Sequence, residues 1–597
     1  MKKTKILTVM SALFVMTACG GEKQIVYKEK WDYDDTHHWH EAVNGNGERS
    51  NYEEHTYGSK PQEFSDGEYW VCSKCFQKKK YEGGSTHPID TDDGLFSEVT
   101  EFENTVEIHT PAQKEYLAYT GEYLTMDRNS YPDGNKKNSN PIQVANQDVE
   151  AVKTTVTWNY EDHSEDTTYS VSISSKSDFS DGFDIAGTNE QSIDLYNLYL
   201  GKNYYKINAI VDGSIESSSG VHELTVDSTY PRNLYVGNNM TNCRDMGGRV
   251  IENGNATIKQ GLIYRTCGNG YNQDGVKIDQ EGIDIMLKQL KVKTEIVLHN
   301  DSGFNFNLDG TKVFNTYMDY KNGTNTKHHF SRNTENVKNV FEILANENNY
   351  PVYYHCRIGT DRTGLIAILV NGVLGVSLND IYQDYLFSNF GKIGSKRKIG
   401  AGDEDDITNY MNEILSMKGD TFQEKVYNVL ITIGVPATTI AKVQNLLLDG
   451  TAPSCDNGQV VVSADKMTLA GGLTLQTENK AGLESRNNPA AYTTLSAGGT
   501  ATFSFNGEGV KELWMYVGNS DQSTSKKFNA SMSVTVDGAD VSVSTMTFKD
   551  AGMGNYRNRV NYYFVKIGNT ASLSAGSHTV VVTGIANSLN LGNVSVL

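Results

Sequence analysis

One stretch of the sequence combines residue types that are suited to phosphate chemistry. It reads His355-Cys356-Arg357-Ile358-Gly359-Thr360-Asp361-Arg362-Thr363-Gly364. An apolar run typical of a buried strand ends at Tyr354, and a segment with helical apolar spacing begins near Thr363. A loop in that place can direct successive backbone N–H groups inward, in front of a helix N-terminus, and so form a cradle for an anion.

The side chains of this loop fit a nucleophilic mechanism on phosphorus. The helix N-terminus and a nearby arginine favour the thiolate form of Cys356, which is the nucleophile. Arg362 can hold two phosphate oxygens with its planar fork, and Thr363 can donate its hydroxyl to the sulfur. Together with Asp361, these residues are the predicted catalytic set within the loop. The predicted substrate-binding residues are His355, Arg357, Ile358, Gly359, Thr360 and Gly364.

The leaving oxygen needs a proton, so a general acid is required. The segment Lys312–Met318 reads as a strand that ends at Asp319, which makes Asp319 the first candidate. Asp361 inside the loop is the second candidate, and Asp301, after another predicted strand, is the third.

These residues resemble the bacterial protein-tyrosine/serine phosphatase family with its HCxxGxDRTG signature. Further stretches match the family, namely 242–248 (NCRDMGG), 261–266 (GLIYRT) and 380–389 (DIYQDYLFSN). The likeness covers roughly residues 229–450. It implies a phosphocysteine intermediate on Cys356, a phosphorylated protein or small phosphate ester as substrate, and no cofactor. It also implies that Arg244, Asp245 and Arg265 form a buried charge network beneath the site.

Two departures from the family pattern are informative. Thr360 stands where relatives often have lysine, which favours singly phosphorylated tyrosine over polyphosphorylated inositols. Cys243 and Cys267 replace commoner Phe or Val and Gly, which suggests an added disulfide. Two alternatives remain open: a cysteine-type inositol-phosphate or phosphoinositide phosphatase, and a surface glycan-binding adhesin whose phosphatase domain is inactive.

The alternation of strands and helices between residues 229 and 452 predicts an α/β core with a largely parallel central sheet. Expected strands are 294–299 and 351–355, and expected helices are 282–290, 333–346, 363–374, 378–388 and 422–433. All-β sandwich domains are expected to flank this core, so the chain is predicted to be multidomain.

Residues 140–228 alternate apolar and polar residues in short runs and resemble a fibronectin type III domain. Residues 449–454 read as a linker. Beyond it, residues 458–597 return to alternating strands and resemble carbohydrate-binding jelly rolls. That resemblance implies a glycan as a further partner.

The start of the chain predicts export. Three lysines precede an apolar run from Ile6 to Ala18, and residues 16–19 (MTAC) resemble a lipoprotein signal box. We therefore expect residues 1–19 to be a signal peptide and Cys19 to carry the lipid that anchors the protein at the bacterial cell surface or membrane; ordinary secretory cleavage is the alternative. The net charge of −20 argues against a nucleic-acid partner.

Residues 20–93 are rich in aromatic residues, His and Cys. Cys72-Ser73-Lys74-Cys75 is half of a zinc-ribbon pattern, because a two-residue gap lets both thiolates face one metal. His40, His55 or His87 could complete a site with two cysteines and two histidines. A disulfide or a metal-free vestige of such a ribbon is the alternative interpretation.

Overall fold

The structure is a computed structural model of the 597-residue chain. It describes residues 27–28, 31–42, 48–57, 62–64, 67–72, 74–80, 94–119, 123, 144–145, 147–149, 151–269, 278–300, 307–318, 333–394, 396–397, 399, 407–477, 491–519, 525–551, 562–586 and 589–597. In these parts of the chain, no helix is both long and apolar enough to cross a bilayer.

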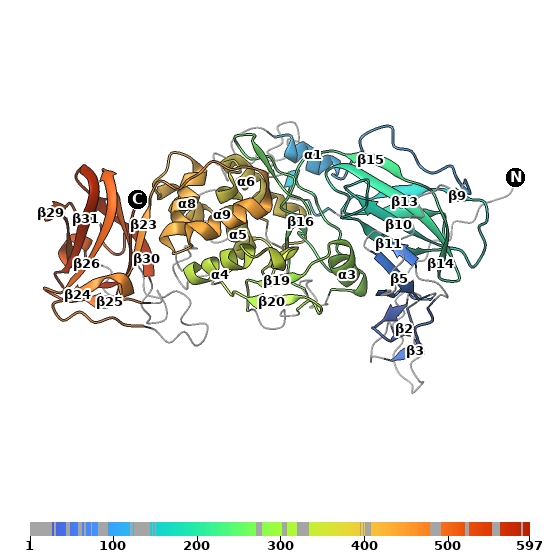
Figure 1. Ribbon diagram of the computed structural model, residues 1–597, viewed down its shortest axis with the longest axis horizontal. Helices are drawn as coiled ribbons and strands as arrows, with labels where there is room; N and C mark the ends of the chain where they lie inside the picture. The colour runs from blue at the N-terminus through green and yellow to red at the C-terminus, as the bar shows by residue number, and fades with distance from the viewer. Residues whose placement is uncertain are drawn as a thin grey trace, which may run out of the picture. The chain divides into compact units, whose positions relative to one another are not determined.

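The chain divides into two compact units. The first comprises residues 1–63, 67–87 and 210–216, and the second comprises the rest. The amino-terminal part of the first unit consists of short antiparallel strands (Figure 1). They are β1 (Asp32–Tyr33), β2 (His37–Glu41), β3 (Arg49–Glu54), β4 (Gln62–Phe64), β5 (Gly67–Val71) and β6 (Lys78–Lys80).

A β-sandwich begins the second unit, except that residues 210–216, at the end of β13 and the start of β14, are grouped with the first unit. Its five-stranded sheet has the order β11-β10-β13-β14, with β15 also paired to β13, and further pairs join β12 to β8 and β7 to β9. The bounds are β7 (Phe96–Ser97), β8 (Thr154–Thr157), β9 (Asn159–Tyr160), β10 (Thr168–Ser174), β11 (Phe183–Thr188), β12 (Ser192–Leu195), β13 (Gly201–Val211), β14 (Ser214–Ser218) and β15 (His222–Val226).

The sandwich begins earlier in the chain than position 140, the start predicted from the sequence. Phe96 lies in strand β7, which pairs with β9, and its side chain packs in the same core as Trp158. Val106 forms a parallel bridge with Val226. Short pieces of strand separated by a long insertion carry too little alternation to be recognised from sequence.

The central domain is built on one five-stranded sheet of order β16-β18-β21-β19-β20. Strands β18, β21, β19 and β20 run parallel, whereas β16 is antiparallel to β18. The bounds are β16 (Arg244–Asp245), β18 (Ile263–Thr266), β19 (Thr294–Val297), β20 (Lys312–Asn315) and β21 (Val352–His355). Since parallel strands end at the same edge, the residues that follow β18, β19 and β21 are neighbours.

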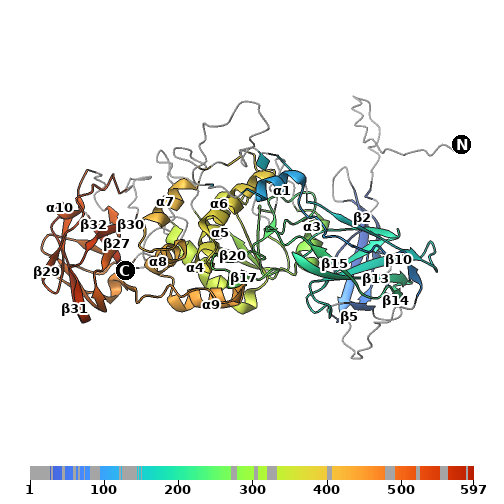
Figure 2. The same cartoon turned by 90° about the horizontal axis from the view of Figure 1, so that it is seen from above.

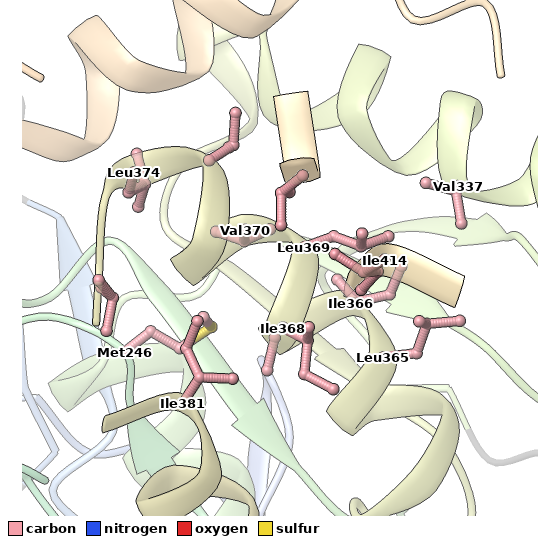
Figure 3. Close-up of a cluster of buried hydrophobic side chains, with 14 of the residues drawn as sticks. Met246, Val337, Leu365, Ile366, Ile368, Leu369, Val370, Leu374, Ile381 and Ile414 are labelled. Carbon is pink, nitrogen blue, oxygen red and sulfur yellow. The ribbon is translucent and has the colours of Figure 1, made fainter. Parts of the chain in front are cut away.

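Helices surround this sheet (Figures 1 and 2). In and around the central domain they are α1 (Pro111–Leu117), α3 (Gln280–Asp284) with a π-helical turn Ile285–Gln289, α4 (Thr334–Leu344), α5 (Asp361–Leu374), α6 (Leu378–Phe387), α7 (Thr408–Ser416), α8 (Phe422–Thr432) and α9 (Ala437–Leu447). The helices predicted from apolar spacing are present, and α7 and α9 are additional. Helix α5 is buried along its whole length, and Leu365, Ile366, Leu369 and Val370 lie in the cluster drawn in Figure 3.

The linker that follows the central domain, predicted to comprise residues 449–454, starts later than expected. Strand β22 (Leu448–Gly450) pairs with β17 (Ala256–Ile258), so Asp449 and Gly450 still belong to the central domain. A side chain at Gly450 would place its Cβ 2.4 Å from the Asn255 carbonyl oxygen. The two strands pair too closely at this position for any residue larger than glycine.

The carboxy-terminal domain contains two five-stranded sheets, of orders β23-β32-β27-β30 with β25 on β32, and β24-β26-β31-β28-β29. Its apolar core includes Phe503, Met515 and Val582. The bounds are β23 (Val460–Ser463), β24 (Thr468–Ala470), β25 (Thr493–Leu495), β26 (Thr500–Gly509), β27 (Glu512–Asn519), α10 (Phe528–Ser531), β28 (Met532–Val536), β29 (Ala539–Val541), β30 (Tyr562–Asn569), β31 (Leu573–Gly584) and β32 (Leu589–Val596).

Candidate active site

Cys356 lies where strand β21 ends and a short loop leads into helix α5. Its side chain is 2% exposed and forms no disulfide. The backbone N–H of Cys356 donates to the Thr363 hydroxyl oxygen over 2.8 Å. A hydroxyl that accepts this bond still has its own proton to donate, as the predicted role of Thr363 at the sulfur requires.

Three successive loop carbonyls, those of residues 357–359, accept hydrogen bonds from the surrounding protein. The Arg357 carbonyl accepts from the Gly268 N–H at 3.0 Å, and the Ile358 and Gly359 carbonyls accept from the Asn242 amide at 3.3 and 2.9 Å. The Gly359 carbonyl also accepts from the Arg265 guanidinium at 2.9 Å.

This anchoring determines where the loop N–H groups point. In a trans peptide the C=O of one residue is antiparallel to the N–H of the next. With the carbonyls of residues 357–359 held outward, the N–H groups of residues 358–360 point away from those anchors. That is the arrangement of an anion cradle at a helix N-terminus.

Gly359 is required by the close approach of this loop to strand β18. Its φ is +72°, and an added Cβ would lie 2.5 Å from the Thr266 carbonyl oxygen. Gly364 is less constrained, because its Cβ would lie 3.2 Å from the Tyr385 ring. The first glycine therefore allows the loop conformation, and the second allows α5 and α6 to pack closely.

A buried ion cluster supports the loop from below. The Asp384 carboxylate accepts from Arg244 Nε at 2.9 Å and from Arg265 at 2.5 Å, and Tyr230 donates to it at 2.7 Å. Burial alone would raise the pKa of Asp384, but the two arginine charges and their hydrogen bonds hold that pKa well below its usual range. Because Arg265 bonds both Asp384 and the Gly359 carbonyl, the cluster fixes the loop.

Asp245 belongs to a second buried pair rather than to this cluster. It accepts from Arg232 at 3.0 Å and from the N–H groups of Gly247 and Gly261 at 2.8 and 2.6 Å. Burial raises the pKa of Asp245, and the Arg232 charge opposes this effect. Arg232 also donates to the Leu198 carbonyl of the β-sandwich at 3.0 Å, so this pair joins the sandwich to the central domain.

His355 is a buried positioning residue. Its Nε2 lies 2.8 Å from Glu295 Oε1, and its Nδ1 lies 3.2 Å from the Cys356 carbonyl oxygen. Its side chain is only 2% exposed. The substrate-binding role of His355 stays a prediction. Glu295 was not singled out from the sequence, where it is one acidic residue in an apolar strand.

The geometry also describes the surroundings of Thr360 and Asp361, two further residues of the predicted site. The Thr360 side chain is fully buried, and its hydroxyl accepts from the Asn242 amide at 3.3 Å. Its substrate-binding role stays a prediction. Asp361 is a predicted general acid, yet Arg397 donates to both of its oxygens at 2.9 Å. Both oxygens of Asp361 are thus engaged by one arginine, and its role as general acid stays a prediction.

Arg357 and Arg362 occupy different environments. The Arg357 side chain is exposed, whereas Arg362 is 6% exposed at the first turn of α5. An exposed arginine can contact groups around a bound phosphate, and a buried one at the helix start is suited to the phosphate itself.

The predicted disulfide between Cys243 and Cys267 is absent, because both thiols are free. The two are close: the neighbouring Cys267 side chain, together with burial, raises the pKa of the Cys243 thiol. The Cys267 sulfur instead accepts from the Thr241 N–H at 3.2 Å.

The other two general-acid candidates, Asp319 and Asp301, lie outside the described residues. Strand β20 ends at Asn315 and the described chain continues to Met318, directly before Asp319. Since parallel strands place their following loops at one edge, the loops after β19 and β20 start on the Cys356 side of the sheet.

We expect Asp319→Asn to slow hydrolysis of alkyl phosphates roughly 10²-fold or more and of activated aryl phosphates far less, because only the poor leaving group needs a proton. Steady-state kinetics on both substrates check this. Asp301→Asn is the parallel variant. Leaving-group dependence in Asp361→Asn rather than in either of these would show that the Arg397 pair does not exclude acid catalysis.

Comparison with known proteins agrees with this geometry. Residues 237–434 match the tyrosine phosphatase family. The match covers the cradle, Asn242, Arg265 and Asp384, and amounts to about a third of the chain. It supports a phosphatase, a hydrolase of phosphate esters, without establishing protein phosphotyrosine as the substrate. No curated protein matches the chain.

Solved structures resemble about a quarter of the chain each. The core catalytic domain of a PP-IP phosphatase from S. cerevisiae is 21% identical, with 24% of this chain and 76% of that chain covered and a TM-score of 0.17. A family 35 carbohydrate-binding module from Clostridium thermocellum is 19% identical, covering 23% and 97%, with a TM-score of 0.17. A β-(1,4)-mannanase from Podospora anserina is 16% identical, covering 24% and only 27%, with a TM-score of 0.18. TM-scores this low establish neither the fold nor an activity.

Of the predicted zinc ligands, the structure brings together Cys72, Cys75 and His55. The fourth member of the group is His38, which was not predicted from the sequence. His87 lies outside the described residues, and the His40 ring instead stacks on Trp31 with centroids 3.9 Å apart.

Proposed function

We propose that the central domain is an α/β cysteine phosphatase that hydrolyses phosphate monoesters through a phosphocysteine on Cys356. The observation that supports the proposal is the anchoring of three successive loop carbonyls, those of Arg357, Ile358 and Gly359, by the surrounding protein. Anchored carbonyls leave the N–H groups that follow them directed away from these anchors. Anchors of this kind give a cradle that is formed before the substrate arrives.

The reaction has two steps. The Cys356 thiolate attacks phosphorus, so that a P–S bond forms and the P–O bond to the leaving group breaks, while a general acid gives its proton to the leaving oxygen. Water then attacks phosphorus and gives one proton to the deprotonated acid, which is thereby regenerated. The P–S bond breaks, and inorganic phosphate and the thiolate are released. Arg362 and the loop N–H groups stabilise the charge on the phosphoryl oxygens in both steps.

The substrate class that we propose is protein phosphotyrosine. Within the loop 356–362, Arg357 is the exposed basic side chain, because Arg362 is buried. One exposed base supports a single phosphate better than the several phosphates of an inositol polyphosphate. The net charge of −20 adds repulsion toward polyanions, which salt screens beyond about 10 Å.

A substrate panel tests this proposal on the full chain. We expect kcat/KM to be highest for a phosphotyrosine peptide, followed by phosphoserine and phosphothreonine peptides, and lowest for phosphoinositides and phytate. Cys356→Ser serves as the blank for each substrate. A higher kcat/KM for phytate or a phosphoinositide than for the phosphotyrosine peptide would show that the protein is an inositol-phosphate phosphatase instead. If no ester is hydrolysed, the alternative of a glycan-binding adhesin with an inactive phosphatase domain is favoured.

We further propose that the protein is exported and anchored by lipid on Cys19. The support is the charged start, the apolar run and the signal-box resemblance of residues 1–19. One acyl chain binds membranes weakly, so stable anchoring requires the diacyl group expected at such a cysteine.

We expect the parent protein to sediment with membranes in its bacterial host, and Cys19→Ala to leave the unprocessed precursor or to shift the protein to the soluble fraction. Fractionation and intact-mass analysis measure this. Cys455→Ala is the control cysteine. Equal fractionation and equal mass of Cys19→Ala and parent, apart from the substitution, would contradict lipidation.

A further inference from the structure

Four potential metal ligands converge in the amino-terminal unit, and none of them takes part in the phosphatase chemistry. They are His38, His55, Cys72 and Cys75, and their ligand atoms all lie within 4.8 Å of one another. His38 and Cys72 are fully buried, Cys75 is 7% exposed, and His55 is partly exposed. Both thiols are free.

The distances in this cluster suit a tetrahedral metal ion. The Cys72 sulfur lies 3.7 Å from His38 Nδ1, and the Cys75 sulfur lies 3.2 Å from His55 Nδ1. With Zn–S near 2.3 Å and Zn–N near 2.0–2.1 Å, a tetrahedron places sulfur and nitrogen about 3.5 Å apart. The two observed separations lie on either side of this value.

The backbone brings the four residues together from separate segments. Cys72 and Cys75 bracket a tight turn closed by the Phe76 N–H on the Cys72 carbonyl at 3.0 Å. An antiparallel bridge pairs Cys72 with Tyr57, two residues after His55. The His55 N–H donates to the Thr36 carbonyl at 3.1 Å, which ties the end of β3 to the start of β2, where His38 lies.

The second nitrogen of each imidazole is also informative. His55 Nε2 lies 2.7 Å from the Asp34 carbonyl oxygen, so it carries the proton and leaves the Nδ1 lone pair facing Cys75. Among the described residues, the buried His38 Nε2 has no hydrogen-bond partner, and its nearest carboxylate oxygen, on Glu53, is 4.0 Å away. A buried histidine with so few hydrogen bonds needs another stabilising contact for its ring.

We propose that His38, His55, Cys72 and Cys75 bind one structural Zn²⁺. Two thiolates with two imidazoles favour zinc over magnesium or calcium, which prefer oxygen ligands. Four protein ligands close the coordination sphere, so the ion has no open position for catalysis. The ion would stabilise a unit whose described residues bury few large apolar side chains, chiefly Trp39 and Val71.

Metal analysis of the full chain in a Cys356→Ser background tests the proposal, since the catalytic thiol could otherwise bind zinc itself. After dialysis, we expect about one zinc per chain, as a closed four-ligand site requires. Cys72→Ala and His38→Ala should each reduce the zinc content several-fold. His40→Ala, on the same strand, and Cys455→Ala, at a distant free thiol, should leave it unchanged.

Cobalt substitution gives a readout that does not depend on substituting any of the four ligands. Co²⁺ added to the metal-free Cys356→Ser protein should produce thiolate-to-cobalt charge transfer and the intense visible bands of tetrahedral coordination, and zinc should abolish both. A chain without bound zinc, a zinc content unchanged in Cys72→Ala, a six-coordinate cobalt spectrum, or a Cys72–Cys75 disulfide in the protein as isolated would each overturn the proposal.

Discussion

Replacing Cys356 by serine is expected to lower kcat by at least about 10³-fold while leaving phosphate-ester binding within a few-fold of the parent. An alcohol at this position is a far weaker nucleophile than a thiolate, and the substitution removes the only atom that forms the covalent bond. The cradle survives, because its carbonyls are anchored by Gly268, Asn242 and Arg265, which the substitution does not touch.

Turnover of a phosphotyrosine peptide and calorimetric binding of the same peptide measure the two effects separately. Cys455→Ser is the matched control, because Cys455 is also a buried free thiol but lies after the central domain. It should retain parental kcat. Activity above a few per cent in Cys356→Ser would falsify the covalent mechanism, and loss of peptide binding would show that the cradle depends on the sulfur.

The largest effect on stability is expected for Asp384→Asn. This carboxylate pairs with Arg244 and Arg265, and all three side chains are at most 3% exposed. Removing one partner of a buried ion cluster leaves uncompensated charge, which costs about 3–5 kcal/mol of unfolding free energy. Activity should fall as well, since Arg265 would no longer be held against the Gly359 carbonyl.

Asp380→Asn provides the control on the same helix. Asp380 pairs with Arg249, but its side chain is 37% exposed, so the expected loss is about 0–1 kcal/mol. Denaturant unfolding at neutral pH compares the variants. Equal losses of unfolding free energy in Asp384→Asn and Asp380→Asn would mean that the Asp384 cluster is not buried in solution.

The pH dependence of Asp384 has a definite sign. Its pKa in the folded protein lies well below the ordinary value of 3.8, so its contribution to stability is complete above that value. The contribution is lost as the pH falls from about 3.8 toward the folded pKa. The difference in stability between the parent and Asp384→Asn should therefore narrow only in this acidic range.

The sequence was sufficient to predict the elements that form the candidate active site. Apolar spacing predicted β19, β21, α5 and α6 to within a few residues, because these elements are long or buried and strongly patterned. The order strand, loop, helix around Cys356 followed directly. The family match over residues 237–434 agrees with the resemblance that these motifs carried.

The partners of the charged residues could not be predicted in the same way. Arg265 and Asp384 lie far apart in the chain, and Asp361 meets Arg397 only because the chain returns after α6. Such pairings depend on tertiary packing, which local pattern does not encode. For the same reason, the contact of Glu295 with His355 and that of His38 with Cys72 could not be predicted from the sequence.

Tyr116 and Tyr123, near the amino-terminal end of the second unit, determine where a fragment that contains the central domain can begin. Tyr116, on α1, is fully buried against Phe387 and Phe390, and its hydroxyl donates to the Gln383 carbonyl at 2.7 Å. Tyr123 packs beside it and contacts the Gln383 side chain. Gln383 directly precedes Asp384, the carboxylate that holds Arg265 against the loop.

A fragment starting at residue 229 would therefore expose the helix that carries Asp384 and remove the Leu198 carbonyl that Arg232 uses. A fragment that keeps these contacts together with the complete core of the β-sandwich begins before Phe96, because Phe96 pairs and packs within that sandwich. In such a fragment the sandwich acts as part of the enzyme's scaffold, and limited proteolysis should release the sandwich and the central domain as one piece.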